Sequence, residues 1–333
     1  MKIAIVKLSS LGDIIHSMVA LQFIKRSYPD SKIDWIVEEK YKGLLENNLH
    51  LDNIFTVSLQ KAKKRKSIFL LFKELKKIRK LKGYDFVIDA QGLLKSAIVA
   101  KMISTKHNVG FDKKSIREPM AAIFYNHKVS VAYDENSIER NIAVICNPLN
   151  ISLQSNDIID KNWFIISSFK NKPSSKTYII FVIGSTWESR NYPKEKYVEI
   201  ANKLQKNCLI IWGNESEKIK ANWMAHQSDF IEVAPKLTLD ELKGVIENSS
   251  LLIGNDTGPS HMAWAMNLPS IILFGPTPIN RVYQTKINRV LKSSSKVDHF
   301  NLDKNDYSIK EIRVDEVVKI SKELLEVNLW KFQ

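Results

Sequence analysis

The sequence lacks the features that mark secreted, metal-binding and membrane-spanning proteins. Its two cysteines, Cys146 and Cys208, lie far apart and form neither a metal-type spacing nor a redox pair. We therefore expect a reducing compartment, no disulfide framework and no metal site. No apolar run reaches the roughly 18 residues that a membrane-spanning helix needs, and the first apolar stretch is too short for a signal peptide. These absences predict a cytosolic protein.

Two nucleotide-binding fingerprints are also missing. A dinucleotide-binding dehydrogenase shows G-x-G-x-x-G after its first strand, but the corner that follows residues 3–6 contains only Gly12. The G-x-x-x-x-G-K-[ST] sequence of a P-loop does not occur in the chain. The sequence therefore argues against a nicotinamide-dependent dehydrogenase and against a P-loop protein.

What the chain does have is an excess of positive charge. It holds 50 lysines and arginines against 36 acidic residues, a net charge of +14. Such a balance attracts polyanions, namely nucleic acid, an anionic membrane or a phosphorylated substrate, and the sign of the charge does not choose among them. Nucleic-acid binding is disfavoured, because the sequence shows neither an aromatic stacking platform nor a recognition motif.

One basic block stands out, the sequence KAKKRK at residues 61–66. The stretch SIFLLFKELKKIRKLK follows it and has the layout of a basic amphipathic helix. Its apolar side holds Phe69, Phe72, Leu75 and Ile78, and its basic side holds Lys73, Lys76, Lys77 and Lys80. Two interpretations stay open: the helix is packed on its own domain with a solvated face, or it contacts an anionic substrate or membrane surface.

Strand and helix patterns alternate along the whole chain, which predicts an α/β protein with mostly parallel sheets. A length of 333 residues is too large for one ordinary core and suggests two domains. The polar stretch KNKPSSK around Asn171 predicts a linker, and the strand and helix rhythm restarts after it. We therefore expect two doubly wound domains, residues 1–170 and 171–310, and a helix over residues 314–329 in a tail of 311–333.

The strongest local signal is LLIGNDTGPSHMAWA, in which a buried strand runs into a polar corner and then a helix. Gly258 lets the backbone approach a ligand closely, and the free amides at the helix start form an anion site. A diphosphate fits such a corner. The alternative is that Asp256 and Thr257 are only turn and cap residues, and that His261 is an ordinary half-buried histidine.

Two further loops of the second half end predicted strands. In GSTWESRNYP, the hydroxyls of Ser185 and Thr186 and the guanidinium of Arg190 could donate to a phosphate; the alternative is a surface loop with a solvated arginine. In WGNESEK, Glu217 could accept from ribose hydroxyls, as acids do in nucleotide-binding folds. This second signal is weak by itself.

The first half offers an acid at a corner of the same kind, in KLSSLGDIIHS. The helix dipole and nearby amides keep Asp13 ionised at neutral pH. An ionised carboxylate in a cleft can act as a general base, but an aspartate that only caps the helix looks the same in sequence. The cations Arg117 and Arg140 near strand ends are either binding groups or structural ion-pair partners.

Taken together, these motifs resemble the bacterial lipopolysaccharide heptosyltransferases of glycosyltransferase family 9. The resemblance runs over essentially the whole chain and is carried by IVKLSSLGDIIHS, WIVEE, DAQGLLKSA, REPMAAIFYN, the acid after WG, NDTGPSH and FGPT. NDTGPSH and the opening corner are shared across the wider family. DAQGLLKSA and REP are similar to the first heptosyltransferase of the pathway rather than the second.

The resemblance implies a GT-B fold, in which two Rossmann-like domains face each other across a cleft and the C-terminal helix returns to the N-terminal domain. It implies inverting, metal-independent transfer of L-glycero-D-manno-heptose from ADP-heptose to a Kdo residue of Kdo-lipid A, with no cofactor. The location implied is the cytoplasmic face of the inner membrane. A related enzyme with a heptose acceptor is the alternative within the family, and a basic nucleic-acid-binding protein is the alternative from another class.

The resemblance also assigns roles to residues of this chain. Asp13 aligns with the catalytic base, and Arg190 stands where the family has a lysine at the phosphate, a change that keeps the charge but alters reach and geometry. The implied donor-binding residues are Ser185, Thr186, Arg190, Glu217, Asp256, Thr257, Gly258 and His261. The implied acceptor-binding residues are Ser10, Gly12, Lys64, Arg117 and Arg140, and Ser10 and Gly12 form a tight turn that leaves room for a sugar.

Overall fold

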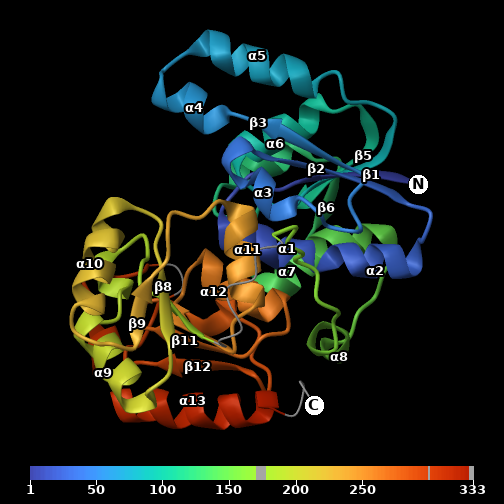
Figure 1. Cartoon of the computed structure of the whole chain (residues 1–333). Coiled ribbons are helices and arrows are strands. Elements are labelled where there is room, and N and C mark those ends of the chain that lie inside the picture. The colour runs from blue at the N-terminus through green and yellow to red at the C-terminus, as the bar shows by residue number, and fades with distance from the viewer. Residues whose placement is uncertain (170–177, 299–300, 330–333) are drawn as a thin grey trace. The chain divides into compact units, whose positions relative to one another are not determined.

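The computed structural model describes residues 1–169, 178–298 and 301–329. Contacts between Cα atoms divide the chain into two compact units, Met1–Phe164 and Ile165–Gln333, which are coloured blue to green and green to red in Figure 1. The division falls six residues before the predicted boundary at residue 170. The predicted linker itself, residues 170–176, lies outside the described residues.

The N-terminal unit is built on a parallel sheet. Its six described strands lie in the order β3-β2-β1-β4-β5-β6, and each neighbouring pair is parallel. Residues 3–6 of β1 are apolar and fully buried, as expected for a strand that helices cover on both faces. The strands are β1 Lys2–Val6, β2 Lys32–Glu38, β3 Asn53–Val57, β4 Tyr84–Asp89, β5 Thr105–Phe111 and β6 His127–Val129.

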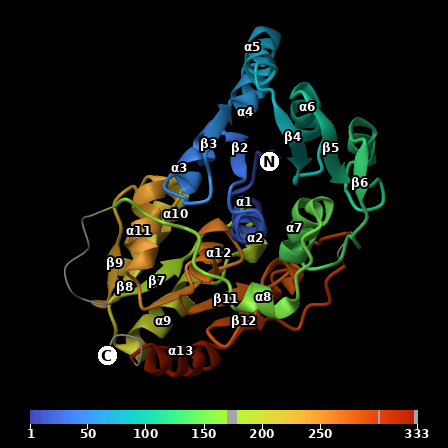
Figure 2. The ribbon, with the colours of Figure 1, turned by 90° about the vertical axis from the view of Figure 1, so that its right-hand side faces the viewer.

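Helices cover both faces of this sheet (Figure 2). On one face, α1, α2 and α7 pack against one another. On the other face, α6 and the end of α5 pack over a core that contains Ala4 and Val6 of β1. The helices are α1 Leu11–Met18, α2 Ala20–Ser27, η1 Glu39–Tyr41, α3 Lys42–Leu45, α4 Leu59–Lys64, α5 Ile68–Ile78, α6 Leu94–Met102, η2 Pro119–Phe124, α7 Ser137–Cys146, η3 Asn147–Leu149 and α8 Ser155–Ile159.

The C-terminal unit repeats this architecture. Its six described strands are all parallel and lie in the order β12-β11-β10-β7-β8-β9. Counted from its own first strand, this is the same 3-2-1-4-5-6 order as in the N-terminal unit, the order of Rossmann folds. The strands are β7 Ile179–Val182, β8 Cys208–Ile211, β9 Ile231–Val233, β10 Leu251–Asn255, β11 Ser270–Phe274 and β12 Asn288–Lys292. The predicted pair of doubly wound domains is therefore confirmed.

The helices of this unit also form two layers. α9, α10 and α13 share one face, where Phe181 and Ile253 contribute to the core, and α11 packs against α12 on the other. The helices are η4 Glu188–Arg190, α9 Lys194–Leu204, α10 Glu215–Ala225, α11 Leu239–Glu247, α12 Gly258–Ala265, η5 Ile279–Arg281, η6 Ser308–Glu311 and α13 Val314–Leu329.

The tail helix forms where the sequence predicts it, and it packs on the core of the C-terminal unit. Val317 and Leu324 of α13 are buried in the core of the C-terminal unit, and α13 packs along α9. Lys203 of α9 adds an ion pair with Asp315, 2.7 Å long. The apolar face of the helix is thus covered within its own unit, and the expected return of the tail to the N-terminal domain stays a prediction.

Each sheet has one point where its strand order reverses. In the N-terminal unit the point lies between β1 and β4, and in the C-terminal unit it lies between β7 and β10. The helices that follow these neighbouring strands cover opposite faces, so a crevice stays open at the carboxyl ends of the strands, and ligands of such folds bind there. Predicted site residues follow β1, β7 and β10 at these two points, whereas Lys64, Arg117, Arg140 and Glu217 follow other strands. Among the described residues, no helix is long and apolar enough to cross a membrane.

We predict that Leu324→Ala loosens α9 rather than the N-terminal unit. Leu324 is buried against that core, and removing such a leucine side chain costs about 2–5 kcal/mol. Hydrogen exchange should report lower protection for the amides of α9 and unchanged protection in α1. Glu323→Ala, a change at an exposed neighbour on the same helix, is the control and should leave both helices unaffected. Loss of protection in α1 would contradict the packing described here.

Candidate active site

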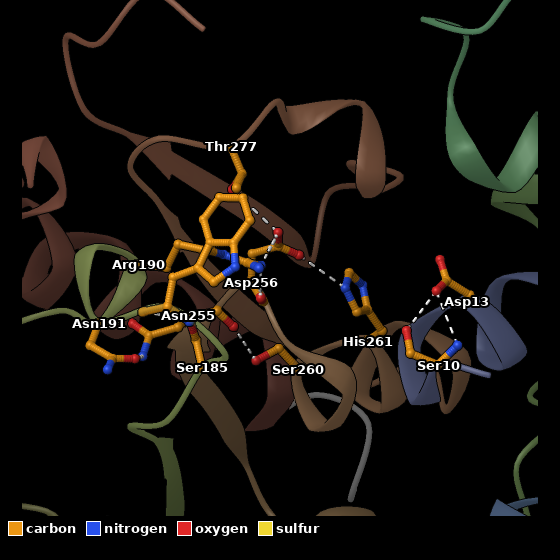
Figure 3. Close-up of polar contacts among 11 residues, drawn as sticks. Ser10, Asp13, Ser185, Arg190, Asn191, Asn255, Asp256, Ser260, His261 and Thr277 are labelled. Atoms are coloured by element: carbon orange, nitrogen blue, oxygen red, sulfur yellow. Dashed lines mark hydrogen bonds and ion pairs between the residues drawn. The ribbon is translucent and has the colours of Figure 1, made fainter. Parts of the chain in front are cut away.

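The corner between β1 and α1 holds Asp13 at the third position of the helix. Its Oδ2 accepts hydrogen bonds from the backbone N–H of Ser10 at 3.1 Å and from the Ser10 hydroxyl at 2.6 Å (Figure 3). This is the helix-capping arrangement that the sequence left open. Among the described residues, no hydrogen bond reaches the other oxygen, Oδ1. One carboxylate can therefore cap the helix through Oδ2 and still present Oδ1 to a substrate.

The surroundings of Asp13 favour its charged form. Partial burial raises the pKa of this carboxyl, but the positive charge of Lys7, the hydrogen bonds from Ser10 and the nearby His16 lower it further than burial raises it. The net pKa lies below the ordinary value of 3.8. Asp13 is consequently ionised at neutral pH, as a group that accepts a proton must be.

Lys7 is a functional candidate that the sequence did not single out. Its side chain is buried, and its Nζ donates to the carbonyl of Ala90 at 2.7 Å and to Oδ1 of Asn141 at 2.9 Å. Burial lowers the pKa of Lys7, whereas the charges of Asp13 and Asp89 oppose that shift. The sequence contains one sign of this role: Lys7 directly follows the buried strand β1. At that position the ammonium group is directed toward the switch point and not toward solvent.

The DAQG segment after β4 has a structural role at the same switch point. Asp89 accepts through Oδ1 from the N–H groups of Gln91 at 2.8 Å and Gly92 at 3.3 Å, and through Oδ2 from the hydroxyl of Tyr125 at 2.7 Å. Gly92 has a φ of +69°, which favours glycine. Oε1 of Gln91 then accepts from the backbone N–H of Leu8 at 2.7 Å. The segment therefore clamps the loop after β1 to the loop after β4.

The structure brings only some of the predicted acceptor residues together. Ser10 and Gly12 share the corner with Asp13. Arg140 donates to the backbone carbonyls of Ser115 and Ala132, so its guanidinium has the structural use that the sequence left open. Lys64 at the end of α4 and Arg117 before η2 are exposed, and among the described residues neither makes a hydrogen bond or ion pair with the corner. Their roles stay predictions.

In the C-terminal unit, the switch point contains a buried charged cluster centred on Asp256. Arg190 donates through Nη2 to Oδ2 of Asp256 at 2.5 Å and also to its backbone carbonyl. Oδ1 of Asp256 lies 3.2 Å from Nε2 of His261, and the Thr277 hydroxyl donates to Oδ2 at 3.3 Å. Figure 3 shows Arg190, Thr277 and His261 directed at this one carboxylate. Three predicted residues therefore form one unit, and Thr277 of FGPT joins it.

The cluster keeps Asp256 charged although it is buried. Burial alone raises the pKa of this carboxyl, but the hydrogen bond from His261 and the charge of Arg190 outweigh it and hold the pKa well below the usual range. The Arg190 side chain is 12% exposed, and its Nε is buried without a hydrogen-bond partner in the described structure. An unpaired buried donor of this kind is costly.

Asn255 and Ser260 are two residues of NDTGPSH whose roles sequence reasoning missed. The Asn255 amide donates to the carbonyl of Ile183 at 2.9 Å, and its Oδ1 accepts from the N–H of Tyr192 at 3.0 Å. Ser260 donates from its hydroxyl to the carbonyl of Asn255 at 2.7 Å. Asn255 thus holds the loop after β7 against the end of β10, which positions Arg190 beside Asp256.

Thr257 occupies the N-cap position of α12, but its side chain makes no capping hydrogen bond. Gly258 is the first helical residue and Pro259 follows it, as in the predicted first turn. The amide of Gly258 lies at the positive end of the helix dipole, where negative charge is favoured. In the preceding loop, the Ser185 hydroxyl donates to the carbonyl of Trp187 at 3.0 Å, while Thr186 is exposed.

Glu217 lies at the start of α10, after the second strand of the unit. Its Oε2 accepts from the N–H of Gly213 at 2.6 Å, and its Oε1 accepts from the Asn214 side chain at 2.7 Å. A Cβ on Gly184 would come within 2.1 Å of the carboxylate, so Glu217 reaches across to the loop after β7. An acid at this place in a Rossmann fold contacts a ribose, and the geometry is compatible with that prediction.

Comparison with known proteins adds the family to this geometry. The sequence profile of glycosyltransferase family 9 (heptosyltransferase) matches residues 71–305. The chain belongs to glycosyltransferase family 9. Lipopolysaccharide heptosyltransferase 1 of Campylobacter coli is 36% identical over 344 residues, which cover 97% of this chain and 99% of that protein. Lipopolysaccharide heptosyltransferase 1 of Escherichia coli K12 is 30% identical and covers 83% of this chain and 88% of its own length.

Solved structures agree with this membership. The Escherichia coli heptosyltransferase WaaC with ADP superimposes with a TM-score of 0.82 at 26% identity, and covers 97% of this chain and 100% of its own. The same enzyme with ADP-2-deoxy-2-fluoro heptose gives a TM-score of 0.79 at 26% identity and covers 97% of this chain and 99% of its own. The predicted family, the GT-B class of fold and the glycosyltransferase activity of this heptosyltransferase are thereby confirmed.

We predict that Asp256→Asn destabilises the enzyme in a pH-dependent way. Removing one partner of a buried ion pair costs about 3–5 kcal/mol because Arg190 loses its counter-charge. The folded pKa of Asp256 is below its unfolded value of about 3.9, so its contribution is present above that value and is lost as pH falls below it. The variant should therefore unfold at a lower temperature than wild type at pH 7, with a smaller difference near pH 3.

The matched control is Asp229→Asn, an exposed aspartate of the same unit. It should change the unfolding temperature little at either pH. An equal destabilisation by Asp256→Asn at pH 7 and pH 3 would show that the charge of the carboxylate is not what holds the cluster.

Proposed function

We propose that this heptosyltransferase transfers L-glycero-D-manno-heptose from ADP-heptose to a Kdo residue of Kdo-lipid A, in assembly of the lipopolysaccharide inner core. One observation carries the proposal: similarity to a lipopolysaccharide heptosyltransferase 1 extends over 97% of the chain. The structure of Escherichia coli WaaC with ADP-2-deoxy-2-fluoro heptose supports the choice of donor. The charged groups at the two switch points support the chemistry, because the carboxylate and the cation belong to different units.

In this proposal, Asp13 is the general base. Its ionised carboxylate takes the proton of the attacking Kdo hydroxyl through Oδ1, while Ser10 holds Oδ2. The hydroxyl oxygen then bonds to the anomeric carbon of the heptose, and ADP leaves from the opposite face with the electron pair of the broken bond. Attack and departure on opposite faces invert the anomeric centre through an oxocarbenium-like transition state.

The C-terminal unit holds the donor and stabilises the departing ADP. The amides at the start of α12 and the guanidinium of Arg190 supply positive charge where the diphosphate gains negative charge. Asp256 and His261 orient that guanidinium and the corner around it. These groups perform the charge neutralisation in a metal-independent reaction, and the carboxylate of Glu217 accepts from the ribose.

The acceptor carries carboxylates and phosphates and is borne by a membrane. We place the enzyme peripherally at the cytoplasmic face of the inner membrane, with Ser10 and Gly12 beside the reacting sugar. Lys64, Arg117 and Arg140 are the proposed acceptor-binding cations, and for Arg140 that role is added to its hydrogen bonds with backbone carbonyls. No cofactor is required beyond the donor substrate.

The experiment that tests the function is an ADP-release assay with ADP-heptose and Kdo2-lipid A. Turnover with a Kdo acceptor is the expected result. A heptosylated acceptor is supplied in competition, because preference for it would assign the second-heptose reaction instead. No turnover with any Kdo acceptor would overturn the proposal.

We predict that Asp13→Ala and Asp13→Asn each lower turnover by about 10²–10⁴-fold, the usual contribution of a general base. ADP affinity, measured by titration calorimetry, should stay near that of the wild type, because the proposed donor site lies in the other unit. Asp30→Asn, at an exposed aspartate of the same unit, serves as the control. Turnover of the Asp13 variants near the wild-type rate would remove the base assignment.

We predict that the Glu217→Gln variant no longer distinguishes ADP from deoxy-ADP, because it lacks the carboxylate that accepts from the ribose hydroxyls. Wild-type enzyme should bind 2′-deoxy-ADP or 3′-deoxy-ADP more weakly than ADP by about tenfold, the factor that one lost hydrogen bond to a charged group contributes. The variant should bind ADP and the same deoxynucleotide with similar affinity. Equal discrimination by both proteins would mean that Glu217 only caps α10.

A further inference from the structure

The segment of residues 61–82 carries most of the net charge of the protein; we call it the basic arm. It contains eleven lysines and arginines and a single acid, Glu74, so it contributes +10 to the chain's net charge of +14. Glu74 is buried and is paired with Lys77 at 2.7 Å. The accessible charge of the arm is therefore almost entirely positive. Both views place α5, at the end of α4, on the outside of the N-terminal unit (Figures 1 and 2).

The first two turns of α5 expose apolar side chains. Phe69 is 77% exposed and Phe72 is 67% exposed, and their spacing of three residues puts them on one face of the helix. Only the second half of α5 is packed, where Ile78 is buried and Leu75 lies against the same core. The amphipathic pattern thus correctly marks an apolar face, but half of that face is exposed among the described residues.

A pocket lies beside the start of α5. Ile68 and Leu71 line a pocket of about 750 Å³ between α4, α5 and α6. Lys63 and Lys66 stand at the same pocket, together with Lys95. The start of α5 therefore has apolar side chains both on its exposed face and in the pocket, and lysines lie around them.

The charge of the arm selects among the possible occupants. A second copy of the chain would bring another +10 against the first, so self-association through this surface is disfavoured. An anionic bilayer matches both features, since lysine side chains reach headgroup phosphates while aromatic and aliphatic residues enter the acyl region. Each lysine near an anionic leaflet contributes favourably, and the sum over the arm is large.

We propose that the basic arm docks the enzyme on an anionic membrane surface, with Phe69 and Phe72 inserted among the lipids and the lysines on the phosphates. Lys73 and Lys76 follow these phenylalanines by four residues each, which places their ammonium groups beside the inserted rings. The proposal deepens the proposed function, on which it rests only for the choice of the membrane that bears the acceptor.

Lys95 connects the basic arm to the corner that holds Asp13 within the same unit. Lys95 lines the pocket beside α5, and its Nζ donates to the Ser9 hydroxyl at 3.2 Å. Ser9 precedes the Ser10 that holds Asp13. A bilayer at the arm therefore lies next to the corner where a membrane-borne sugar would react.

The experiment is flotation of the full-length enzyme with lipid vesicles, without donor or acceptor. Wild-type protein should float with vesicles that contain phosphatidylglycerol and should not float with pure phosphatidylcholine. Raising the salt concentration should weaken the binding, because exposed charges are screened. Failure to bind anionic vesicles would overturn the proposal and would leave the proposed transferase reaction untouched.

Two variants separate the apolar and the electrostatic contributions. Phe69→Ser combined with Phe72→Ser should lower the vesicle partition coefficient at least tenfold, and Lys76→Gln combined with Lys80→Gln should lower it about tenfold. Ile219→Ser is the matched control, since Ile219 on α10 is 70% exposed and lies in the other unit. Wild-type partitioning by the phenylalanine variant would overturn the docking surface.

A second readout reports insertion directly. The two native cysteines are buried, so Phe69→Cys can be labelled selectively with an environment-sensitive fluorophore. Its emission should shift to the blue on anionic vesicles, whereas the same label at Ile219→Cys should not respond. The absence of a shift at Phe69→Cys would contradict insertion. Binding of RNA or DNA that exceeds vesicle binding and is lost in the phenylalanine variant would assign the arm to nucleic acid instead.

Turnover distinguishes this proposal from the proposed function. With a water-soluble, deacylated Kdo acceptor, the phenylalanine variant should keep the wild-type rate. With the acceptor embedded in anionic vesicles, its rate should fall at least tenfold. Equal rates with the embedded acceptor would show that the arm has no role in reaching the membrane.

Discussion

The reversal of strand order is the constraint on which both candidate sites depend. In each sheet, the helices that follow the two strands at the reversal cover opposite faces, so neither closes the crevice between them. The N-terminal unit uses this opening for Asp13 after β1 and for Gln91 after β4. The C-terminal unit uses it for Arg190 after β7 and for Asp256 after β10. Polar corners that are distant in sequence become neighbours because parallel strands end at one edge.

Charge compensation is what allows these corners to stay ionised. A buried charge without a partner is expensive, and each switch point pairs opposite signs. Lys7 is held by Ala90 and Asn141 and stabilises the anion of Asp13. Asp256 is held by Arg190 and His261. The pairs leave Oδ1 of Asp13 without a hydrogen-bond partner in the described structure, and this oxygen is the one that the proposed mechanism uses as the base.

In two helices, the amphipathic pattern predicts an apolar face but does not predict what covers that face. The pattern of α13 predicts an apolar face but not which surface covers it, and contacts with α9 decide that question. The pattern of α5 likewise predicts an apolar stripe, of which Ile78 is buried and Phe69 is exposed. Periodicity reports the composition of a face, whereas the partner depends on the shape of the rest of the unit. In α5, the exposure of Phe69 among the described residues is itself the informative observation.

The sequence by itself determined the order of strands and helices, the division into two doubly wound units and the polar corners around Asp13 and Asp256. These features depend on turn chemistry and on residues a few positions apart, which local patterns record. Only the tertiary structure decided which groups meet. Arg190 reaches Asp256 across 66 residues, and Gln91 reaches Leu8 across 83. Arg190, the predicted phosphate donor, is also half of an ion pair, because contacts between distant segments follow from strand order and packing, which no local pattern contains.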